Sequence, residues 1–379
     1  MAAPRTIRHC EKCGIKVGMS FFAGLDENGL GPLLGPLVVT GVLARATDPS
    51  GEKRIEKKAP KRLMARLGDS KALVSHDDNA LGEAWARELC FGPTGADVPA
   101  DDIIDALLAD PRSHYLSLCP SHHKDHCFGA GHARAEDAAD ERGADLAALR
   151  NDVVRDRAAL ARLGIEIVRV RSVVVCNRML NHATARGVSR FQTDLHAMER
   201  LVLEFREHAG ARVTATCGKV GGFDYYEAAF GPLAGYLKTK IVESRKVSTY
   251  EVLGVGRVSF VMDADASNML VSLASLVGKW VRDALMGKIL GYYRAHDATL
   301  PMASGYHDPV TRAFVQRTSL VRKERRIEDA CFARSAAPPK PAKAIASPKR
   351  APRAPAIERA MERQKMDQKM DQKMDQKKA

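Results

Sequence analysis

The sequence of 379 residues has no apolar run that approaches the roughly 20 residues of a membrane-spanning helix. Its first residues are polar and basic, without the apolar segment of a secretory signal. Its eight cysteines lack the spacing of a small disulfide-stapled domain. These absences argue against a membrane protein and a disulfide-rich secreted domain. We therefore expect a cytoplasmic protein with reduced thiols and a chain long enough to bury a substantial core.

Positive charge is concentrated near the C-terminal end of the chain. The net charge is +13, and residues 334–379 contribute +8 of it, from 13 basic and 5 acidic side chains. This segment is rich in proline, alanine and lysine and ends in a four-residue repeat, so we expect it to be disordered. Such a basic tail is consistent with a polyanionic partner, and a repeat without a binding role is the open alternative.

Residues 19–44 contain two apolar runs separated by a glycine-rich turn. The run from Met19 to Leu25 predicts a buried strand, and the run from Leu37 to Ala44 predicts a second one. Asp26 and Glu27 follow the first run directly. The pattern therefore predicts a hairpin with two adjacent carboxylates at its rim.

Two adjacent carboxylates at the end of a buried strand indicate a bound cation. Burying a carboxylate is unfavourable unless the group is paired, hydrogen-bonded or bound to a metal. The glycines of the turn have no Cβ and allow a ligand to approach the backbone closely. The alternative is an ordinary hairpin whose acidic side chains are simply solvated.

Strands and helices alternate along the rest of the sequence, which predicts a mixed sheet flanked by helices. Residues 92–163 have the look of an insertion, with a Gly-, Pro- and His-rich loop region followed by a long charged helix over 135–163. Strands are expected over 165–175 and 212–216, with two more between 248 and 262. Helices are expected over 75–90, 176–186 and 189–209, and a long one ends near residue 295.

The opening motif, Asp26-Glu27-Asn28-Gly29-Leu30-Gly31-Pro32, resembles the DExGxGP segment of the type 2 ribonuclease H family (ribonuclease HII and its relatives). Three further blocks follow in the family's order and extend the resemblance over roughly residues 20–317. They are Asp69-Ser70-Lys71; Asp263-Ala264-Asp265 with a helix in which Ser275, Lys279, Arg282 and Asp283 keep the family's spacing; and Ala303–Thr311, similar to GSGYPxDPxT.

The resemblance implies a ribonuclease H-like fold over residues 19–333, after an N-terminal extension of residues 1–18. It also implies a site that hydrolyses a phosphodiester with two divalent ions, for which Mg²⁺ or Mn²⁺ suits a set of carboxylate oxygens. By residue-to-residue match, Asp26, Glu27 and Asp265 would be the catalytic, metal-binding acids, and Asp283 a supporting one. The matched substrate-binding residues would be Gly29, Gly31, Ser70, Lys71, Lys279 and Tyr306.

The sequence departs from the family at two positions. Leu30 stands where many bacterial members have arginine. The family's third carboxylate lies in a segment like VDxVG, and its position here is occupied by Gly218. Asp224, Glu227 and Asp263 are nearby acids that the sequence leaves open as substitutes.

Two cysteine- and histidine-containing segments suggest a structural zinc site as a further possibility. Cys10 and Cys13 form a Cys-x2-Cys pair, and the other ligands would come from Cys119, His122, His123, His126 and Cys127. Their spacing matches no common zinc module, and the alternative is two polar loops with incidental thiols.

Three functions remain open from the sequence. The first is an endoribonuclease that cuts RNA in RNA–DNA hybrids or at ribonucleotides embedded in duplex DNA, without an obligate protein partner. The second is a hybrid-binding protein of the same fold, with turnover impaired by Gly218. The third is a zinc-stabilised nucleic-acid adaptor built on the cysteine and histidine segments.

Overall fold

The computed structural model describes residues 20–75, 78–119, 139–220 and 223–335. By internal contacts the chain divides into residues 1–336 and 337–379, and the second unit lies outside the described residues. The N-terminal extension, the basic tail from residue 336 onward, and the zinc candidates Cys10, Cys13, His122, His123, His126 and Cys127 also lie outside them.

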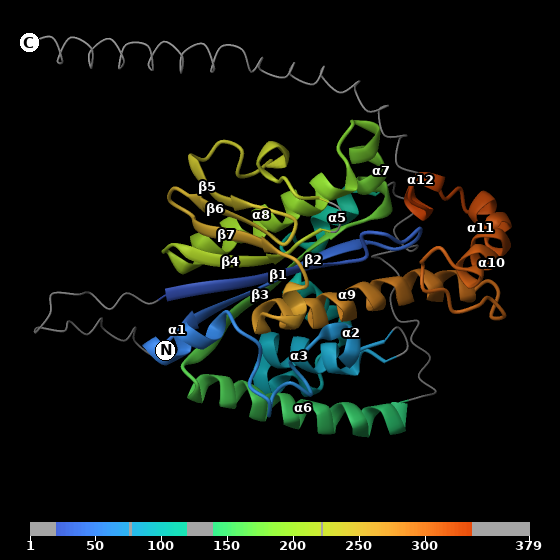
Figure 1. Ribbon diagram of the computed structural model, residues 1–379. Helices are drawn as coiled ribbons and strands as arrows, with labels where there is room; N and C mark the ends of the chain where they lie inside the picture. Colours follow the sequence, from blue (N-terminus) through green and yellow to red (C-terminus); the bar gives the residue numbers. More distant parts are fainter. Residues whose placement is uncertain (1–19, 76–77, 120–138, 221–222, 336–379) are drawn as a thin grey trace, which may run out of the picture. The chain divides into compact units, whose positions relative to one another are not determined.

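A single mixed sheet forms the centre of the described structure (Figure 1). Its seven strands lie in the order β3-β2-β1-β4-β7-β6-β5. Neighbouring strands are antiparallel, except that β4 is parallel to β1 and β7 is parallel to β4. The strands are β1 (Ser20–Asn28), β2 (Leu37–Ala46), β3 (Ile165–Val175), β4 (Val213–Gly218), β5 (Lys238–Glu243), β6 (Val247–Val252) and β7 (Gly256–Val261). The expected mixed sheet flanked by helices is confirmed, and β5 is a strand that the sequence did not predict.

The opening hairpin continues further than its apolar pattern suggests. The expected strand ended at Leu25, but β1 runs to Asn28 because its last residues still pair with β2. Asp26 lies opposite Thr40, and Glu27 lies opposite Val39. Both carboxylates therefore project from a strand whose backbone is held in register by its neighbour.

The parallel pairing brings distant parts of the chain to one edge of the sheet. Leu25 pairs with Cys217 on β4, so Gly218 follows beside Asp26. Gly218 in turn pairs with Val261 on β7, which leads into the turn that holds Asp265. The carboxyl ends of β1, β4 and β7 consequently meet at the same place.

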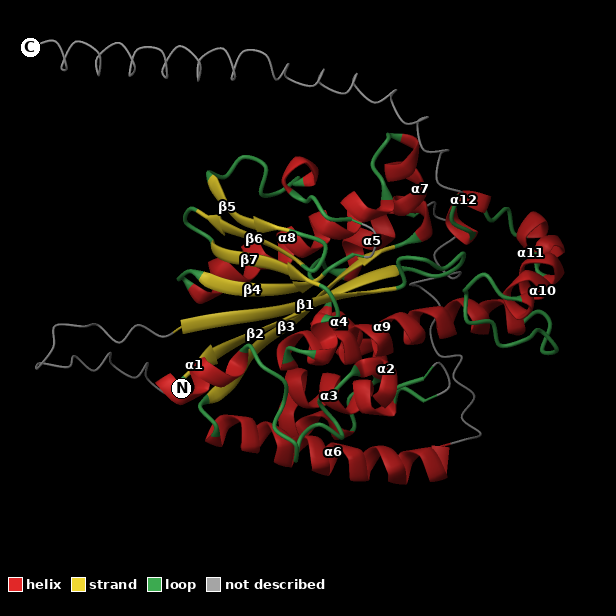
Figure 2. Ribbon diagram, in the orientation of Figure 1, coloured by secondary structure: helices red, strands yellow, loops and turns green. Residues whose placement is uncertain are grey.

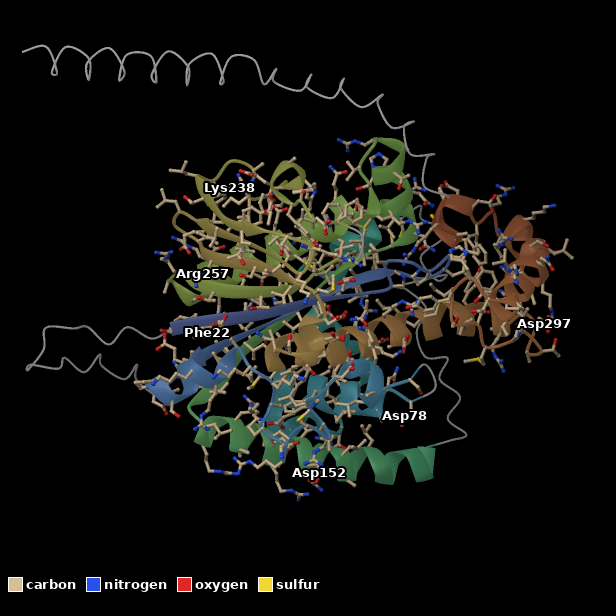
Figure 3. All side chains as sticks on the ribbon, viewed as in Figure 1. Phe22, Asp78, Asp152, Lys238, Arg257 and Asp297 are labelled. Carbon is tan, nitrogen blue, oxygen red and sulfur yellow. The ribbon has the colours of Figure 1, made fainter. Side chains whose placement is uncertain are left out.

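Helices cover both faces of the sheet, as Figure 2 shows with the helices in red and the strands in yellow. One face carries α9 (Met269–Arg294), with α3 (Ala80–Phe91) and α6 (Ala139–Arg162) beyond it, and the other carries α8 (Arg190–Ala209) and α7 (Asn177–Ala185). In Figure 3, Lys238 and Arg257 lie on the β5–β7 half of the sheet, and Asp152 lies on the outermost helix α6. Each face has its own apolar core, so the acids of β1 sit at the end of two packed layers.

The two helices next to the central strands have clear sequence causes. In α8, Ser189 and Gln192 form a reciprocal capping box, and Gly210 ends the helix in a left-handed conformation. Asn268 caps α9 by accepting from the backbone N–H groups of Leu270 and Val271. Gly278 lets α9 lie close to the sheet, because a Cβ there would be 2.8 Å from Thr40 Oγ1.

The described part of residues 92–163 belongs to the core. It contains the 3-10 helix η1 (Gly92–Ala96), α4 (Ala100–Leu107), α5 (Arg112–Leu118) and α6. Ile103, Leu107, Tyr115 and Leu160 are buried in the same cluster as α9. The segment expected as a loop-rich insertion thus contributes helices to the apolar cluster that includes α9, and its description as an insertion stays a prediction.

The C-terminal helices pack on the end of α9, and the contacts with the folded part extend past the expected boundary at residue 333. They are α10 (Pro309–Arg317), α11 (Ser319–Glu324) and α12 (Asp329–Phe332), which build a third apolar cluster with Met286 and Tyr293. Arg334 follows them and is only 4% exposed. Arg334, which composition and charge assign to the tail, therefore packs against the folded part.

The remaining elements are α1 (Pro49–Ile55), α2 (Ser70–Leu73) and the 3-10 helices η4 (Glu227–Ala229) and η5 (Ala264–Ala266). No helix within the described parts of the chain is both long and apolar enough to cross a membrane.

Candidate active site

A pocket of about 570 Å³ opens where β1, β4 and β7 end. All nine residues that the sequence predicts for the site line it, so the structure brings together side chains from positions 26 to 306. These residues are Asp26, Glu27, Gly29, Gly31, Ser70, Lys71, Asp265, Lys279 and Tyr306.

Asp26 lies at the floor of this pocket among polar and acidic neighbours. Burial raises the pKa of Asp26 well above its usual range, and the charges of Glu27 and Asp265 raise it further. A hydrogen bond with Ser275 on α9 opposes this rise. The carboxylate is therefore held in surroundings that disfavour its ionised form.

Glu27 follows Asp26 on the same strand, so its side chain leaves the opposite face of the sheet. Burial raises its pKa to about 8, and Asp194 is the acid that adds most to this rise. Asp265, on η5, is 7% exposed and accepts from Ser70 Oγ at 3.4 Å and from its neighbour Ala266 N at 3.1 Å. Its ion-pair partner is Lys71, whose Nζ is 3.3 Å from Asp265 Oδ2.

The chemistry of these acids suits a hard divalent cation. Carboxylate oxygens are the donors that Mg²⁺ and Mn²⁺ prefer, and burial together with neighbouring acids raises the pKa values of Asp26 and Glu27, so a bound cation would favour their ionised forms. Among the described residues, no three acidic, histidine or cysteine side chains are gathered tightly enough to hold an ion as they stand. A cation would therefore have to draw Asp26, Glu27 and Asp265 together by rotation of their side chains.

The glycine-rich turn forms one wall of the pocket. Gly29 has a φ of +86°, and a Cβ there would be 2.4 Å from Arg282 Nε. Both the backbone conformation and the lack of space therefore exclude a side chain at this position. Gly31 is exposed, with no atom within 4 Å of an added Cβ. Tyr306 is 48% exposed at the rim, and its ring stacks over the guanidinium of Arg282 at 5.1 Å. An aromatic face and a bare backbone thus border the acids.

Two further predicted residues come from α2, which begins beside the acids. Asp69 caps this short helix by accepting from Lys71 N at 3.0 Å. Ser70 is buried, and its hydroxyl is 2.9 Å from that of Ser275. Lys71 keeps 76% of its side chain exposed despite the ion pair with Asp265, so its ammonium is available to an anionic ligand.

Lys279 and Asp283 lie on α9 and line the pocket. Lys279 Nζ lies 2.9 Å from Asp283 Oδ2, and Asn79 Nδ2 donates to the same oxygen at 3.2 Å. Arg282 Nη1 donates to the other oxygen at 3.2 Å. Asp283 is thus fully engaged by protein partners, consistent with the supporting role that the resemblance implies.

Gly218 occupies the position at which the resemblance expects a third acid. A Cβ at this position would lie 2.3 Å from Asp26 Oδ1 and 3.5 Å from Glu27 Oε2. Of the three nearby acids that the sequence leaves open, only Asp263 lines the pocket, where it is exposed in a left-handed turn with φ 51°. Asp224 and Glu227 are exposed elsewhere.

Sequence reasoning missed Arg334, which braces the glycine-rich turn from behind. Its guanidinium donates to the carbonyl oxygens of Gly29 at 2.6 Å, Leu30 at 3.0 Å and Gly35 at 2.7 Å. Burial lowers its pKa to about 9. No pattern in the sequence indicates this role, because Arg334 opens a segment rich in basic residues.

Sequence reasoning also missed Asp194, a carboxylate on α8 behind Glu27. The residue is 0% exposed, and burial raises its pKa well above its usual range. Neither of its carboxylate oxygens has a hydrogen-bond partner among the described residues. A signal was present in the sequence, since Asp194 interrupts the apolar stripe of α8.

Comparisons with known proteins show a distant structural similarity and no sequence match. No family model matches the chain, and a search of curated proteins finds no match. One similar solved structure is a PCNA:RNase HII complex from Archaeoglobus fulgidus, with 16% identity, 86% of this chain and 98% of that chain covered, and a TM-score of 0.35. A second is Bst-RNase HIII in complex with Mn²⁺, with 13% identity, 88% of this chain and 72% of that chain covered, and a TM-score of 0.38. A third is ribonuclease H2 from Pyrococcus horikoshii OT3, with 14% identity, 82% of this chain and 92% of that chain covered, and a TM-score of 0.33. Because the sequence identities and TM-scores are low, these structures add no support to the fold, which is established by the strand order and layers of this chain.

Proposed function

We propose that the protein is a metal-dependent endoribonuclease that cuts the RNA strand of RNA–DNA hybrids or cuts at ribonucleotides embedded in duplex DNA. The observation that carries this proposal is the meeting of Asp26, Glu27 and Asp265 in one pocket with the glycine-rich turn and Tyr306. Carboxylates alone would suit many cation sites. The adjoining bare backbone and exposed aromatic ring favour a nucleic-acid substrate.

Each part of the pocket has a distinct task in this proposal. Asp26, Glu27 and Asp265 would hold two divalent ions, which supply activation of water and stabilisation of the leaving oxygen. The backbone at Gly29 and Gly31 would contact the ribose 2′-hydroxyl, the group that distinguishes RNA from DNA. Tyr306 would stack on the nucleotide at the junction between RNA and DNA.

Positive groups at the rim would hold the nucleic-acid backbone. Lys71 offers an exposed ammonium beside Asp265, and phosphate contacts of this kind fix the register of a duplex. The thiols of Cys90, Cys176, Cys217 and Cys331 are outside any disulfide, which suits the reducing cytoplasm that we propose as the compartment.

A second candidate function rests on Gly218. The position beside Asp26 has no carboxylate, so the protein would be a hybrid-binding protein with weak turnover if no other acid replaces it. Three substrates separate the two candidates: an RNA–DNA hybrid, a DNA duplex with a single ribonucleotide, and the same duplex without it. Binding and cleavage are measured side by side in Mg²⁺, in Mn²⁺ and in EDTA.

The nuclease proposal predicts cleavage of the first two substrates in either metal and none in EDTA. Tight, ribonucleotide-selective binding without cleavage in any metal would favour the second candidate. Equal cleavage of the all-DNA duplex would contradict both.

A further inference from the structure

The buried face of α8 carries one carboxylate that the surrounding structure does not satisfy. Phe191, Leu195, Met198 and Phe205 form the apolar stripe of this helix and are all buried. Asp194 follows Phe191 by three residues and precedes Met198 by four, so it lies on the same stripe. An acid at this position faces the sheet and not the solvent.

The absence of hydrogen bonds to Asp194 is energetically unfavourable. Its side chain is 0% exposed, and neither oxygen has a partner among the described residues. Glu199, on the same helix and 1% exposed, shows the usual solution: it accepts from the backbone N–H of Gly231 at 3.1 Å and of Leu233 at 2.6 Å. A buried carboxylate without such partners destabilises a fold unless it takes up a proton or a cation neutralises its charge.

The surroundings of Asp194 are those of the pocket. Helix α8 packs on β1 and β4, the strands that carry Glu27 and Gly218. The charge of Asp194 raises the pKa of Glu27 and of Cys217, and the charge of Asp26 raises the pKa of Asp194, so Asp194 is electrostatically coupled to the strand ends that border the pocket. Asp194 does not itself line the pocket, whereas Glu27, whose pKa it raises, does.

The strand ends at the pocket carry one carboxylate fewer than the resemblance predicts. Gly218 leaves the strand end of β4 without a carboxylate, and an added Cβ there would collide with Asp26. Asp263 is exposed to water at the rim, where a carboxylate needs no cation. Asp194 is the buried acid on the other side of Glu27, and no described residue donates a hydrogen bond to its charge.

We propose that Asp194 is a further acid of the cation site, which supplies from α8 the negative charge that Gly218 does not supply from β4. This inference rests on the proposed metal-dependent function and specifies which residues of the chain build its metal centre. Asp194, Glu27, Asp26 and Asp265 would together supply the negative charge that holds the cations.

Calorimetric titration of the metal-free protein with Mn²⁺ tests the inference without any substrate. Asp194→Asn keeps the shape of the side chain and removes its charge, and Glu199→Gln is the matched control on the same helix. We expect Asp194→Asn to bind Mn²⁺ about 10–100-fold more weakly than the native protein. Glu199→Gln should bind Mn²⁺ as the native protein does, although it loses hydrogen bonds and unfolds at lower temperature.

Thermal unfolding in EDTA gives a second readout. Since Asp194 makes no hydrogen bonds in the described chain, the metal-free Asp194→Asn protein should be at least as stable as the native protein, and Mn²⁺ should stabilise it less. A variant that unfolds more easily in EDTA, or that binds Mn²⁺ with native affinity, would overturn the role of Asp194. If the native protein binds no Mn²⁺, the proposed function fails together with this inference. If the native protein binds Mn²⁺ and Asp194→Asn binds it equally well, only this inference fails.

A charge exchange between the two positions completes the test. Gly218→Asp in the native background should weaken Mn²⁺ binding, because the new side chain displaces Asp26 and adds a surplus acid. In the Asp194→Asn background the same change should recover part of the lost affinity, since the number of acids is restored. Equal effects of Gly218→Asp in both backgrounds would contradict the inference.

Discussion

Replacement of Gly218 by alanine is expected to lower metal-dependent cleavage by about 100-fold while the protein stays folded. The φ of Gly218 is not positive, so the backbone accepts a Cβ without strain. The nearest atoms that the added carbon meets belong to the side chains of the two adjacent acids, Asp26 and Glu27. The substitution therefore perturbs the proposed catalytic centre more than the rest of the fold.

The size of the effect follows from one distance. The new Cβ would lie 2.3 Å from Asp26 Oδ1, whereas ordinary contact begins at 3.4 Å, so the oxygen must move by about 1.1 Å. A displacement of about 1 Å at a reacting centre can reduce the rate by about 100-fold. The backbone of Asp26 cannot shift to make room, because β1 lies between β2 and β4, so the carboxylate itself must turn away from its present position.

The assay is single-turnover cleavage of a duplex with one ribonucleotide, at saturating protein and Mg²⁺. Gly235→Ala is the matched control, since an added Cβ at this exposed position has no atom within 4 Å. Native cleavage by Gly218→Ala, with the Gly235→Ala control also unchanged, would refute the placement of Gly218 against a catalytic Asp26.

Four further predictions concern the rim, the turn, the tail and the titration of the acids. Tyr306→Ala should lose about 1–3 kcal/mol of preference for the ribonucleotide-containing duplex over the all-DNA duplex, measured by fluorescence anisotropy; an unchanged preference would argue against stacking. Arg334→Ala should reduce the free energy of unfolding in urea by roughly 3 kcal/mol, because three carbonyl oxygens lose a charged donor; a smaller loss than in Arg190→Ala would contradict this. Deletion of residues 337–379, which hold 12 basic and 5 acidic side chains, should leave unfolding unchanged and flatten the salt dependence of duplex binding by about 0.9 for each phosphate that is no longer neutralised; an unchanged slope would show that the tail does not bind the duplex. Because the folded-state pKa of Glu27 is about 8 and its ordinary value is 4.5, the unfolded protein loses this proton first as the pH rises. Stability in EDTA should therefore fall between about pH 4.5 and pH 8, by up to about 1.4 kcal/mol per pH unit for this group, and a flat profile would contradict the burial of these acids.

The sequence was most informative where function depends on residue type and order. Strand, paired acids and glycine-rich turn placed Asp26, Glu27, Gly29 and Gly31 on one hairpin, and the structure brings Asp265 to the same pocket. The catalytic and binding roles of these residues remain predictions. The boundaries were less accurate, because pairing with β2 extends β1 beyond its apolar run.

The sequence was least informative where a role depends on what a residue contacts in the fold. Arg334 has the composition of the tail around it, and only the fold brings its guanidinium to the carbonyl oxygens of the turn. Asp194 interrupts the apolar stripe of an amphipathic helix, but that interruption alone does not distinguish a buried acid from a solvated one. Its importance emerges from complete burial and unpaired oxygens within the described chain, which depend on the packing of α8 against the sheet.

The measurement that tests the central claim most directly compares Asp26→Asn with the native protein in single-turnover cleavage of a duplex bearing one ribonucleotide. In Mg²⁺ the native protein should cut on the 5′ side of the ribonucleotide and leave a 3′-hydroxyl. Asp26→Asn should bind the duplex but not cut it, and Asp224→Asn, an exposed acid outside the pocket, should cut as the native protein does. Native rates in Asp26→Asn with an unchanged melting curve, or cleavage that persists in EDTA, would contradict the account.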